Sequence, residues 1–195
     1  MMKSLPKLVV GLGNPGDQYA FTLHNIGFLT VDYFLQYQQG FSGFKEKHKA
    51  LIAQITIDEQ PVWFMKPQTY MNLSGDAVSE IVRYHRWSDT EVLIIHDEID
   101  FEWGRIQLKK GGGSAGHRGL ESIFQCWQSD FYRLRVGIGK PESRDAKKYV
   151  LANVSKSLIE DLAQSAVNAL KIIFLNGFEN AKSKINPWPK EPTHA

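Results

Sequence analysis

The 195-residue sequence has one cysteine, no long apolar run and no internal repeat. A single cysteine excludes an internal disulfide and is typical of a chain in a reducing cytoplasm. No apolar stretch reaches the ~18 residues needed to cross a bilayer. The short apolar patch near the N-terminus runs directly into a glycine turn and lacks the length and cleavage site of a signal peptide. We therefore expect a cytoplasmic chain that does not bind a membrane.

Signatures of metal and dinucleotide sites are also missing. The six histidines show no H-E-x-x-H motif and no pairing with cysteine, so we expect no metal. The opening stretch VGLGNPG, residues 10–16, does fit G-x-G-x-x-G. A dinucleotide loop, however, needs its third glycine to open a helix and an acid about 20 residues later, at the end of a second strand. Here the first credible helix begins near Thr22 and Asp32 lies in a helical pattern, so we expect no cofactor.

The net charge is only +2, but the charges are unevenly spread. Residues 87–103 contain six acids and no lysine or arginine, whereas residues 104–148 contain ten lysines and arginines against four acids. The basic segment is consistent with a polyanion-binding surface or with an ordinary solvated face.

Short runs rich in valine and isoleucine alternate with helical patterns along the chain. Strands are expected at residues 8–10, 51–57, 62–65, 92–95, 105–108 and 134–138, and helices near 26–34, 78–85, 120–127 and 157–175. The runs at 51–57 and 62–65 are predicted to form a hairpin. This order predicts a single-domain α/β fold, a three-layer sandwich with a mixed, largely parallel sheet and helices on both faces.

We place the α/β domain at residues 1–181. Gly177 is a reasonable end for the last helix. The segment 182–195 contains three prolines and is expected to be an extended or disordered polar tail.

A serine in a glycine-rich loop raises the possibility of a serine esterase. Ser114 matches the middle of G-x-S-x-G between a strand and a helix. A serine triad also needs an acid and a histidine later in the chain, but after Ser114 the histidines are His117, three residues on, and His194 in the tail. This alternative is weakly supported.

Polar side chains gather where the predicted strands end. Asn14 follows the first strand, Asn72 follows the strand at 62–65, Asp97 follows the strand at 92–95, and His24 lies near the start of the first helix. Ligands of open α/β sheets bind at the carboxyl ends of the strands, so we expect these four side chains to share one crevice.

The four side chains have a common chemical logic. A neutral imidazole can take a proton from water, and a carboxylate on its other ring nitrogen fixes the tautomer. Two amides can hold a carbonyl, a water or a developing oxyanion. Taken singly, each residue also has a structural explanation, such as a turn, a helix cap or a solvated surface position. Together they predict a water-activating hydrolase without covalent nucleophile or metal.

Five stretches of the chain together resemble a known family. The stretches VVGLGNPGDQYAFTLHNIG, KPQTYMNLSG, IIHDEID, GGGSAGHRGL and FYRLRVGIGKP occur in that order and look like bacterial-type peptidyl-tRNA hydrolase. The resemblance runs from about Leu8 to about Leu175. It implies a cofactor-free, usually monomeric cytoplasmic enzyme that hydrolyses the ester joining a peptide to the terminal ribose of tRNA. A non-catalytic RNA-binding relative on the same fold is the alternative.

The resemblance also implies roles for individual residues. His24 is then the general base, Asp97 supports its basic form, and Asn14 and Asn72 position substrate and water. Asn14 is also associated with the requirement for a blocked amino group. The positions that match tRNA contacts are Tyr19 and Tyr70 at the acceptor end, and Lys109 and Arg135 at the 5′-phosphate.

Two positions depart from the family pattern. Arg118 stands where the family usually has an asparagine that helps to hold the substrate. An arginine cannot accept a hydrogen bond but can contact a phosphate. Leu23 stands where the family usually has an arginine, directly before the base histidine. This change alters the surroundings of His24 and removes no catalytic group.

Overall fold

The computed structural model describes residues 3–128, 130–141 and 145–187. Its strands are β1 (Leu8–Gly11), β2 (Lys45–Lys47), β3 (Ala50–Ile57), β4 (Gln60–Pro67), β5 (Val92–Glu98), β6 (Ile106–Lys110) and β7 (Tyr132–Gly137). Its α-helices are α1 (Ile26–Leu35), α2 (Ser74–His85), α3 (Arg118–Cys126), α4 (Ala146–Val150) and α5 (Lys156–Ile185). Short 3-10 turns include η1 (Asp17–Tyr19), η2 (Leu23–Asn25) and η3 (Met71–Leu73), which precede helices near the strand ends.

The seven strands form one sheet in the order β2-β3-β4-β1-β5-β7-β6. The four inner strands β4, β1, β5 and β7 run parallel, and β2, β3 and β6 join antiparallel at the edges. The mixed, largely parallel sheet and the hairpin of β3 and β4 are thus confirmed. The exposed edge strand β2 and the short helix α4 were not expected from the sequence, because both are too short for a clear hydrophobic period.

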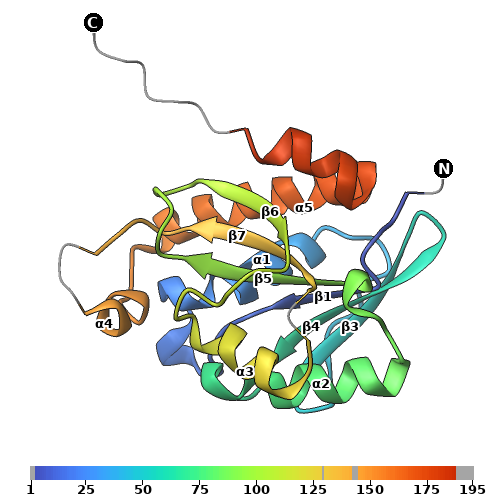
Figure 1. Ribbon diagram of the computed structural model, residues 1–195, viewed down its shortest axis with the longest axis horizontal. Helices are drawn as coiled ribbons and strands as arrows, with labels where there is room; N and C mark the ends of the chain where they lie inside the picture. Colours follow the sequence, from blue (N-terminus) through green and yellow to red (C-terminus); the bar gives the residue numbers. More distant parts are fainter. Residues whose placement is uncertain (1–2, 129, 142–144, 188–195) are drawn as a thin grey trace, which may run out of the picture.

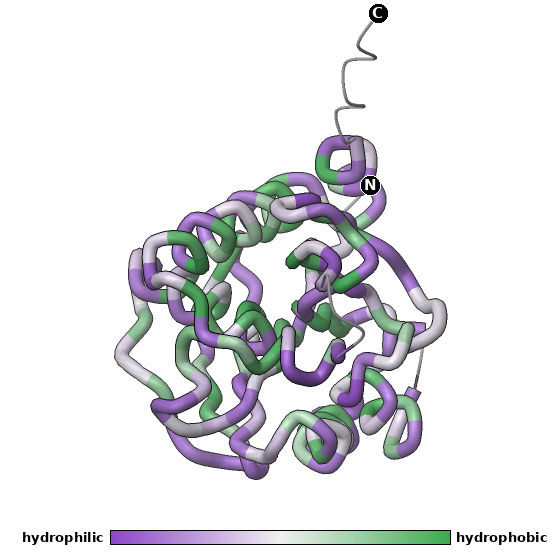
Figure 2. The backbone as a smooth tube through the Cα atoms, turned by 90° about the vertical axis from the view of Figure 1, so that its left-hand side faces the viewer, coloured by the Kyte–Doolittle hydropathy of each residue, from purple (hydrophilic) through white to green (hydrophobic). Residues whose placement is uncertain are grey.

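Helices cover both faces of the sheet (Figure 1). Every residue of β1 and β5 is buried, as expected for central parallel strands with two covered faces. Val9 and Leu93 belong to the core beneath α1 and α5, whereas Val10 and Ile94 belong to the core beneath α2 and α3. Along the backbone, apolar residues concentrate in the interior (Figure 2). The alternation of side chains along each strand therefore divides one strand between two cores, which makes the fold a three-layer sandwich.

The glycines of the opening stretch permit close packing and a tight turn. A Cβ on Gly11 would lie 2.2 Å from the carbonyl oxygen of Gly27 in α1, and one on Gly13 would lie 2.7 Å from the ring of Phe28. Gly16 has φ 106°, a conformation that favours glycine. These glycines let the helix cross closely over the end of β1, and Asn14 lies in the turn between them.

The strand β5 continues further than its hydrophobic run. We expected it to end at Ile95, but it extends through His96 and Asp97 to Glu98 and stays paired with β7 along that length. Polar residues remain in this strand because its C-terminal end borders a pocket and their side chains find partners there.

The last helix continues beyond its expected end at Gly177. Gly177 has non-helical angles (φ 74°, ψ 167°), yet the helix resumes and runs to Ile185. The N-terminal segment passes over this kink, where Phe178 N–H donates to the carbonyl of Ser4. Phe178 stacks on Tyr132 with ring centroids 3.7 Å apart, so packing extends the helix past a residue that would otherwise end it. Residues 188–195 of the expected tail lie outside the described residues.

The asparagine after α5 ties the C-terminal end of the fold to the sheet. Asn186 accepts a hydrogen bond from Leu108 N–H at 2.8 Å and donates one to the carbonyl of Leu108 at 3.0 Å. It thus satisfies backbone groups of the edge strand β6. No helix among the described residues combines the length and apolar character needed to cross a bilayer.

Candidate active site

A pocket of about 630 Å³ opens at the carboxyl ends of the inner strands. Its walls come from the β1–α1 connection, the turn before α2, the end of β5, the loop before α3, and α4. Seven of the residues predicted for the site line it: Asn14, Tyr19, His24, Tyr70, Asn72, Asp97 and Arg118. The crossover connections of the parallel strands bring these residues together from positions far apart in the sequence.

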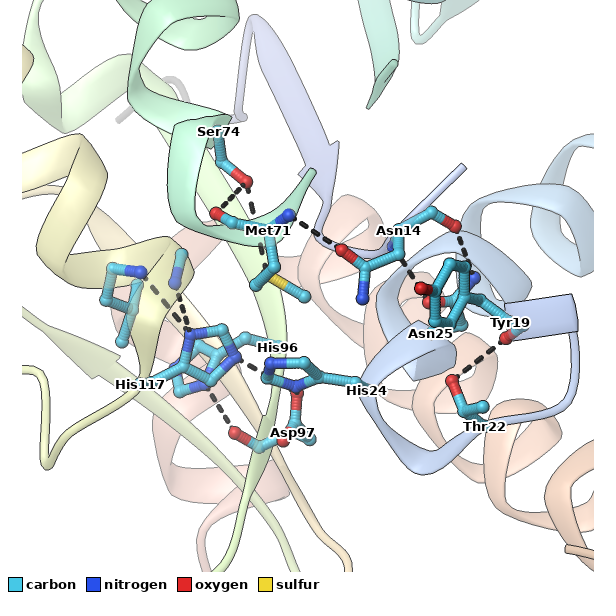
Figure 3. A network of polar contacts seen from close by, with 12 residues as sticks. Asn14, Tyr19, Thr22, His24, Asn25, Met71, Ser74, His96, Asp97 and His117 are labelled. Atoms are coloured by element: carbon cyan, nitrogen blue, oxygen red, sulfur yellow. Dashed lines mark hydrogen bonds and ion pairs between the residues drawn. The ribbon is translucent and has the colours of Figure 1, made fainter. Parts of the chain in front are cut away.

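His24 and Asp97 form a buried pair (Figure 3). The Nδ1 atom of His24, in η2, lies 2.8 Å from Oδ1 of Asp97, at the end of β5. A carboxylate can only accept a hydrogen bond, so Nδ1 carries the hydrogen. The lone pair of the neutral ring is then on Nε2, which has no hydrogen-bond partner within the described residues. The pair therefore prepares Nε2 to take a proton from a molecule in the pocket.

A second histidine binds the same carboxylate oxygen. His117 Nε2 lies 3.0 Å from Oδ1 of Asp97, and its Nδ1 accepts hydrogen bonds from the backbone N–H groups of Gly119 and Leu120 at the start of α3. These two donors require a lone pair on Nδ1, so Nε2 carries the hydrogen and donates to Asp97. From the sequence we considered His117 only as a base for Ser114. Its position between a glycine-rich loop and a helix start was the one available signal for this role.

The two imidazoles keep Asp97 ionised. Burial raises the pKa of this carboxyl, but the attraction of the protonated forms of His24 and His117 and the hydrogen bonds that both rings donate outweigh burial and hold the pKa well below its usual value. An ionised Asp97 fixes the tautomer of His24. It also stabilises the imidazolium that forms when His24 accepts a proton.

His96 lies behind this group and stays neutral. It is fully buried, its Nδ1 donates to the backbone carbonyl of Asp97 at 2.7 Å, and its ring meets that of His117 edge-on at 5.0 Å. Burial and the nearby His117 lower the pKa of His96 well below its usual value. A neutral ring here packs against His117 without adding charge beside the Asp97 carboxylate.

His24, Asp97 and His117 also have the side-chain types of a metal site, with ligand atoms within 4.8 Å of one another. A metal at His117 Nε2 would require a lone pair there, which moves the hydrogen to Nδ1. That hydrogen would then face the N–H groups of Gly119 and Leu120. The backbone at the start of α3 therefore favours hydrogen bonding over metal binding by these three groups.

Buried arginine contacts hold the loop that carries His117. Arg133 on β7 donates to the carbonyl of Gly113 at 2.8 Å and, through its other terminal nitrogen, to the carbonyl of Gly111. Gly111 and Gly116 both have positive φ, at 63° and 78°, so the loop turns sharply where glycine permits it. This bracing places His117 against the end of β5.

Asn14 is oriented by the backbone around it. Its N–H donates to Oδ1 of Asn25 at 2.8 Å, and its Oδ1 accepts from Met71 N–H at 2.7 Å. Because the amide oxygen faces a backbone donor, the amide NH₂ group is left to point into the pocket on the side of His24 (Figure 3). Asn14 therefore presents a hydrogen-bond donor near the base.

The other predicted contacts lie at the rim. Tyr70 is 56% exposed, and Asn72 is exposed and has no side-chain hydrogen bond within the described part of the chain. Tyr19 lies half-buried in η1 and also lines the pocket, and Arg118 opens α3 with its side chain 76% exposed. This rim combines aromatic faces with polar and cationic side chains.

Lys109 and Arg135 lie outside the pocket lining. Lys109 is exposed on the edge strand β6. Arg135 on β7 is largely buried: its guanidinium binds Glu98 at 2.8 and 2.9 Å and Gln107 at 2.6 Å, and it stacks on Phe101. The sequence could not show that Arg135 already has an acidic partner.

Ser114 lacks the geometry of a nucleophile. Its Oγ accepts from Gly116 N–H at 3.2 Å and contacts Glu121 at 3.5 Å. Both ring nitrogens of His117, the nearby histidine, are engaged by Asp97 and by the start of α3. Among the described residues, the serine-esterase alternative therefore lacks a base.

Comparisons with known proteins show the family. The family model described as peptidyl-tRNA hydrolase matches residues 8–193. A peptidyl-tRNA hydrolase of Rickettsia felis is 43% identical over 183 residues, covering 91% of this chain and 98% of that protein. One of Desulforamulus reducens is 43% identical over 184 residues, covering 92% and 88%.

A solved structure has a similar fold. The crystal structure of peptidyl-tRNA hydrolase from Acinetobacter baumannii has a TM-score of 0.87 and 34% identity to this chain, covering 96% of this chain and 98% of that one. The resemblance found in the sequence is confirmed by these matches, and the chain belongs to the peptidyl-tRNA hydrolase family.

Proposed function

We propose that this chain hydrolyses the ester between a peptide, or an N-blocked aminoacyl group, and the 3′-terminal ribose of tRNA. The observation that carries the proposal is the 2.8 Å contact of His24 Nδ1 with Asp97, which leaves Nε2 facing a pocket without a positioned covalent nucleophile. In such a pocket the imidazole activates water. Membership of the family supplies the substrate class.

The proposed reaction consumes one water molecule. His24 Nε2 takes a proton from the water as its oxygen attacks the carbonyl carbon of the ester. The negative charge that develops on the carbonyl oxygen is stabilised by the NH₂ group of Asn14, which its bond from Met71 N–H holds in place. The carbon–oxygen bond to the ribose then breaks, and the imidazolium returns its proton to the ribose oxygen. The products are a peptide carboxylic acid and tRNA with a free terminal hydroxyl group.

The rim residues bind the acceptor end in this proposal. The exposed ring of Tyr70 offers a surface on which the terminal base stacks, and Tyr19 adds a second aromatic ring to the pocket lining. Asn72 lies beside Tyr70 and has donor and acceptor groups for the substrate or the attacking water. A protein that only bound RNA would have no need for the buried pair of His24 and Asp97, so the binding-only alternative is disfavoured.

The test is release of the acyl group from N-acetylaminoacyl-tRNA compared with unblocked aminoacyl-tRNA. We expect the blocked substrate to react at least about tenfold faster in kcat/KM, a difference of about 1.4 kcal/mol in transition-state stabilisation. The two pocket-lining acids are already paired, Asp97 with imidazoles and Glu98 with Arg135, so a free ammonium group would find no free carboxylate among the described lining residues. Equal rates on both substrates would contradict this, and no release from either would refute the activity.

We also propose that Lys109 and Arg135 contact the tRNA 5′-phosphate, with Lys109 supplying most of the free charge. In Lys109→Ala, the slope of the logarithm of the tRNA-binding constant against the logarithm of the salt concentration is expected to become shallower by about one unit, because one fewer counterion is displaced.

Arg135→Ala is expected to lower the free energy of unfolding by about 3–5 kcal/mol, since the variant leaves the buried Glu98 without its cationic partner. Binding titrations at several salt concentrations and urea unfolding measure the two effects. An unchanged slope in Lys109→Ala would place the RNA elsewhere.

We further propose that the chain acts as a monomer in the cytoplasm on the acceptor stem and terminal CCA of peptidyl-tRNA. All the groups used in the proposed reaction belong to one chain and line one pocket. The single cysteine, Cys126, is unpaired, which suits a reducing compartment.

A further inference from the structure

Two cationic side chains face the same pocket from different elements. Arg118 is the first residue of α3, and Lys147 lies on α4, on a separate part of the lining. Both residues are exposed. Among the described residues, Arg118 has one ion pair, a contact of 3.8 Å with Glu121, and Lys147 has none. Both charges are therefore available to a ligand in the pocket.

The acidic groups of the pocket do not neutralise these cations. Asp97 is bound by His24 and His117, and Glu98 is bound by Arg135 at 2.8 Å. Glu121 only weakly holds the guanidinium of Arg118, because an ion pair between solvent-exposed side chains at this separation contributes little free energy. Arg118 and Lys147 are exposed at the mouth of the pocket, whereas Asp97 is buried, so the mouth is positive and attracts anions.

We infer that Arg118 and Lys147 bind the phosphodiester that joins the terminal nucleotide of the substrate to its neighbour. The inference rests on the proposed function, which places the ester of the terminal ribose at His24. The phosphodiester lies on the other side of that ribose and is the nearest anion of the substrate. The guanidinium of Arg118 can donate two parallel hydrogen bonds to phosphate oxygens, and Lys147 adds a second positive charge.

This phosphate site differs from the surface that carries Lys109. Lys109 lies on β6 and does not line the pocket, whereas Arg118 and Lys147 lie in the same pocket as His24. Contact with a single phosphodiester next to the ester does not read the base sequence. It orients the terminal ribose toward the base and holds substrates that have at least two nucleotides.

Three substrates of decreasing length separate this site from other contacts. They are N-acetylaminoacyl-tRNA, the N-acetylaminoacyl ester of the dinucleotide CpA, which has one phosphodiester, and the N-acetylaminoacyl ester of adenosine, which has none. The variants are Arg118→Gln, Lys147→Gln and the double variant. The matched control is Lys148→Gln, which removes an exposed lysine of α4 that does not line the pocket.

The quantity to measure is the ratio of kcat/KM for the CpA ester to kcat/KM for the adenosine ester. We expect this ratio to fall about tenfold in Arg118→Gln and several-fold in Lys147→Gln, as one charge-assisted contact is lost from each. Lys148→Gln is expected to keep the wild-type ratio. An equal loss on both esters would show that the cations act on the ester or on the fold, and a preserved ratio would place the phosphate elsewhere. Either outcome overturns the inference.

Failure of the proposed function gives a different result. In that case the wild-type chain would hydrolyse none of the three substrates. The phosphate site is then judged by binding of unacylated CpA: weaker binding in Arg118→Gln than in Lys148→Gln supports the site, and equal binding overturns it.

Discussion

His24→Ala is expected to lower kcat for N-acetylaminoacyl-tRNA by about 10²–10⁴-fold, the usual contribution of a general base. The ring is held by Asp97 at 2.8 Å, and no other described lining residue presents a free imidazole nitrogen to the pocket. The affinity for tRNA is expected to stay near that of the wild type, because the groups proposed to bind RNA lie at the rim. Single-turnover kinetics and a binding titration measure the two quantities separately.

His85→Gln is a suitable control for that variant. His85 ends α2, stacks on Trp87 with ring centroids 4.2 Å apart, and does not line the pocket. It is expected to keep the wild-type rate. A His24→Ala variant that retained turnover within a few-fold of wild type would refute the general-base role.

Asp97→Asn is expected to reduce kcat by about 10²-fold or more with a much smaller change in KM. An asparagine can turn its NH₂ group toward His24, which forces the lone pair onto Nδ1 and the hydrogen onto Nε2, the wrong tautomer for a base. The variant also removes the charge that stabilises the imidazolium. Steady-state kinetics test this, and a loss confined to KM would contradict the assigned role.

The same variant is expected to change how stability depends on pH. Burial raises the pKa of Asp97, but His24 and His117 hold it well below its usual value in the folded chain. A group with a lowered folded-state pKa stabilises the fold above its unfolded-state pKa, and this contribution is lost as pH falls through the folded-state pKa. Urea unfolding should therefore show the wild type losing stability below about pH 4 more steeply than Asp97→Asn. Identical acid-side slopes would show that the carboxylate is not stabilised in this way.

Much of the fold followed from local patterns. The runs around Val9 and Leu93 indicated buried strands, and the alternation of strands with helices led to the layered architecture that the structure confirms. The ends of elements were harder to predict. Gly177 and the polar residues after Ile95 favour an end locally, but packing of Phe178 on Tyr132 and pairing of β5 with β7 extend both elements.

The position of several site residues also followed from the chain, since polar side chains after parallel strands meet at one edge of the sheet. Asn14, His24, Asn72 and Asp97 line one pocket, as that rule predicted. The role of His117 did not follow, because it depends on the α3 backbone fixing the ring tautomer while Asp97 lies 20 residues away. The ion pair of Arg135 with Glu98 could not be predicted either, because it depends on the pairing of two strands that are distant in the sequence.

What the sequence determined and what only the tertiary structure decided differ in the range over which the interactions act. Hydrophobic period, turn residues and residue types act over a few neighbours, so they define the strands, the helices and the groups available for chemistry. A hydrogen bond between residues 73 positions apart, such as that of His24 with Asp97, exists only once the connections have crossed over the sheet. The protonation state and charge of each site residue depend on the atoms within a few ångströms of it, and only the tertiary structure determines which atoms those are.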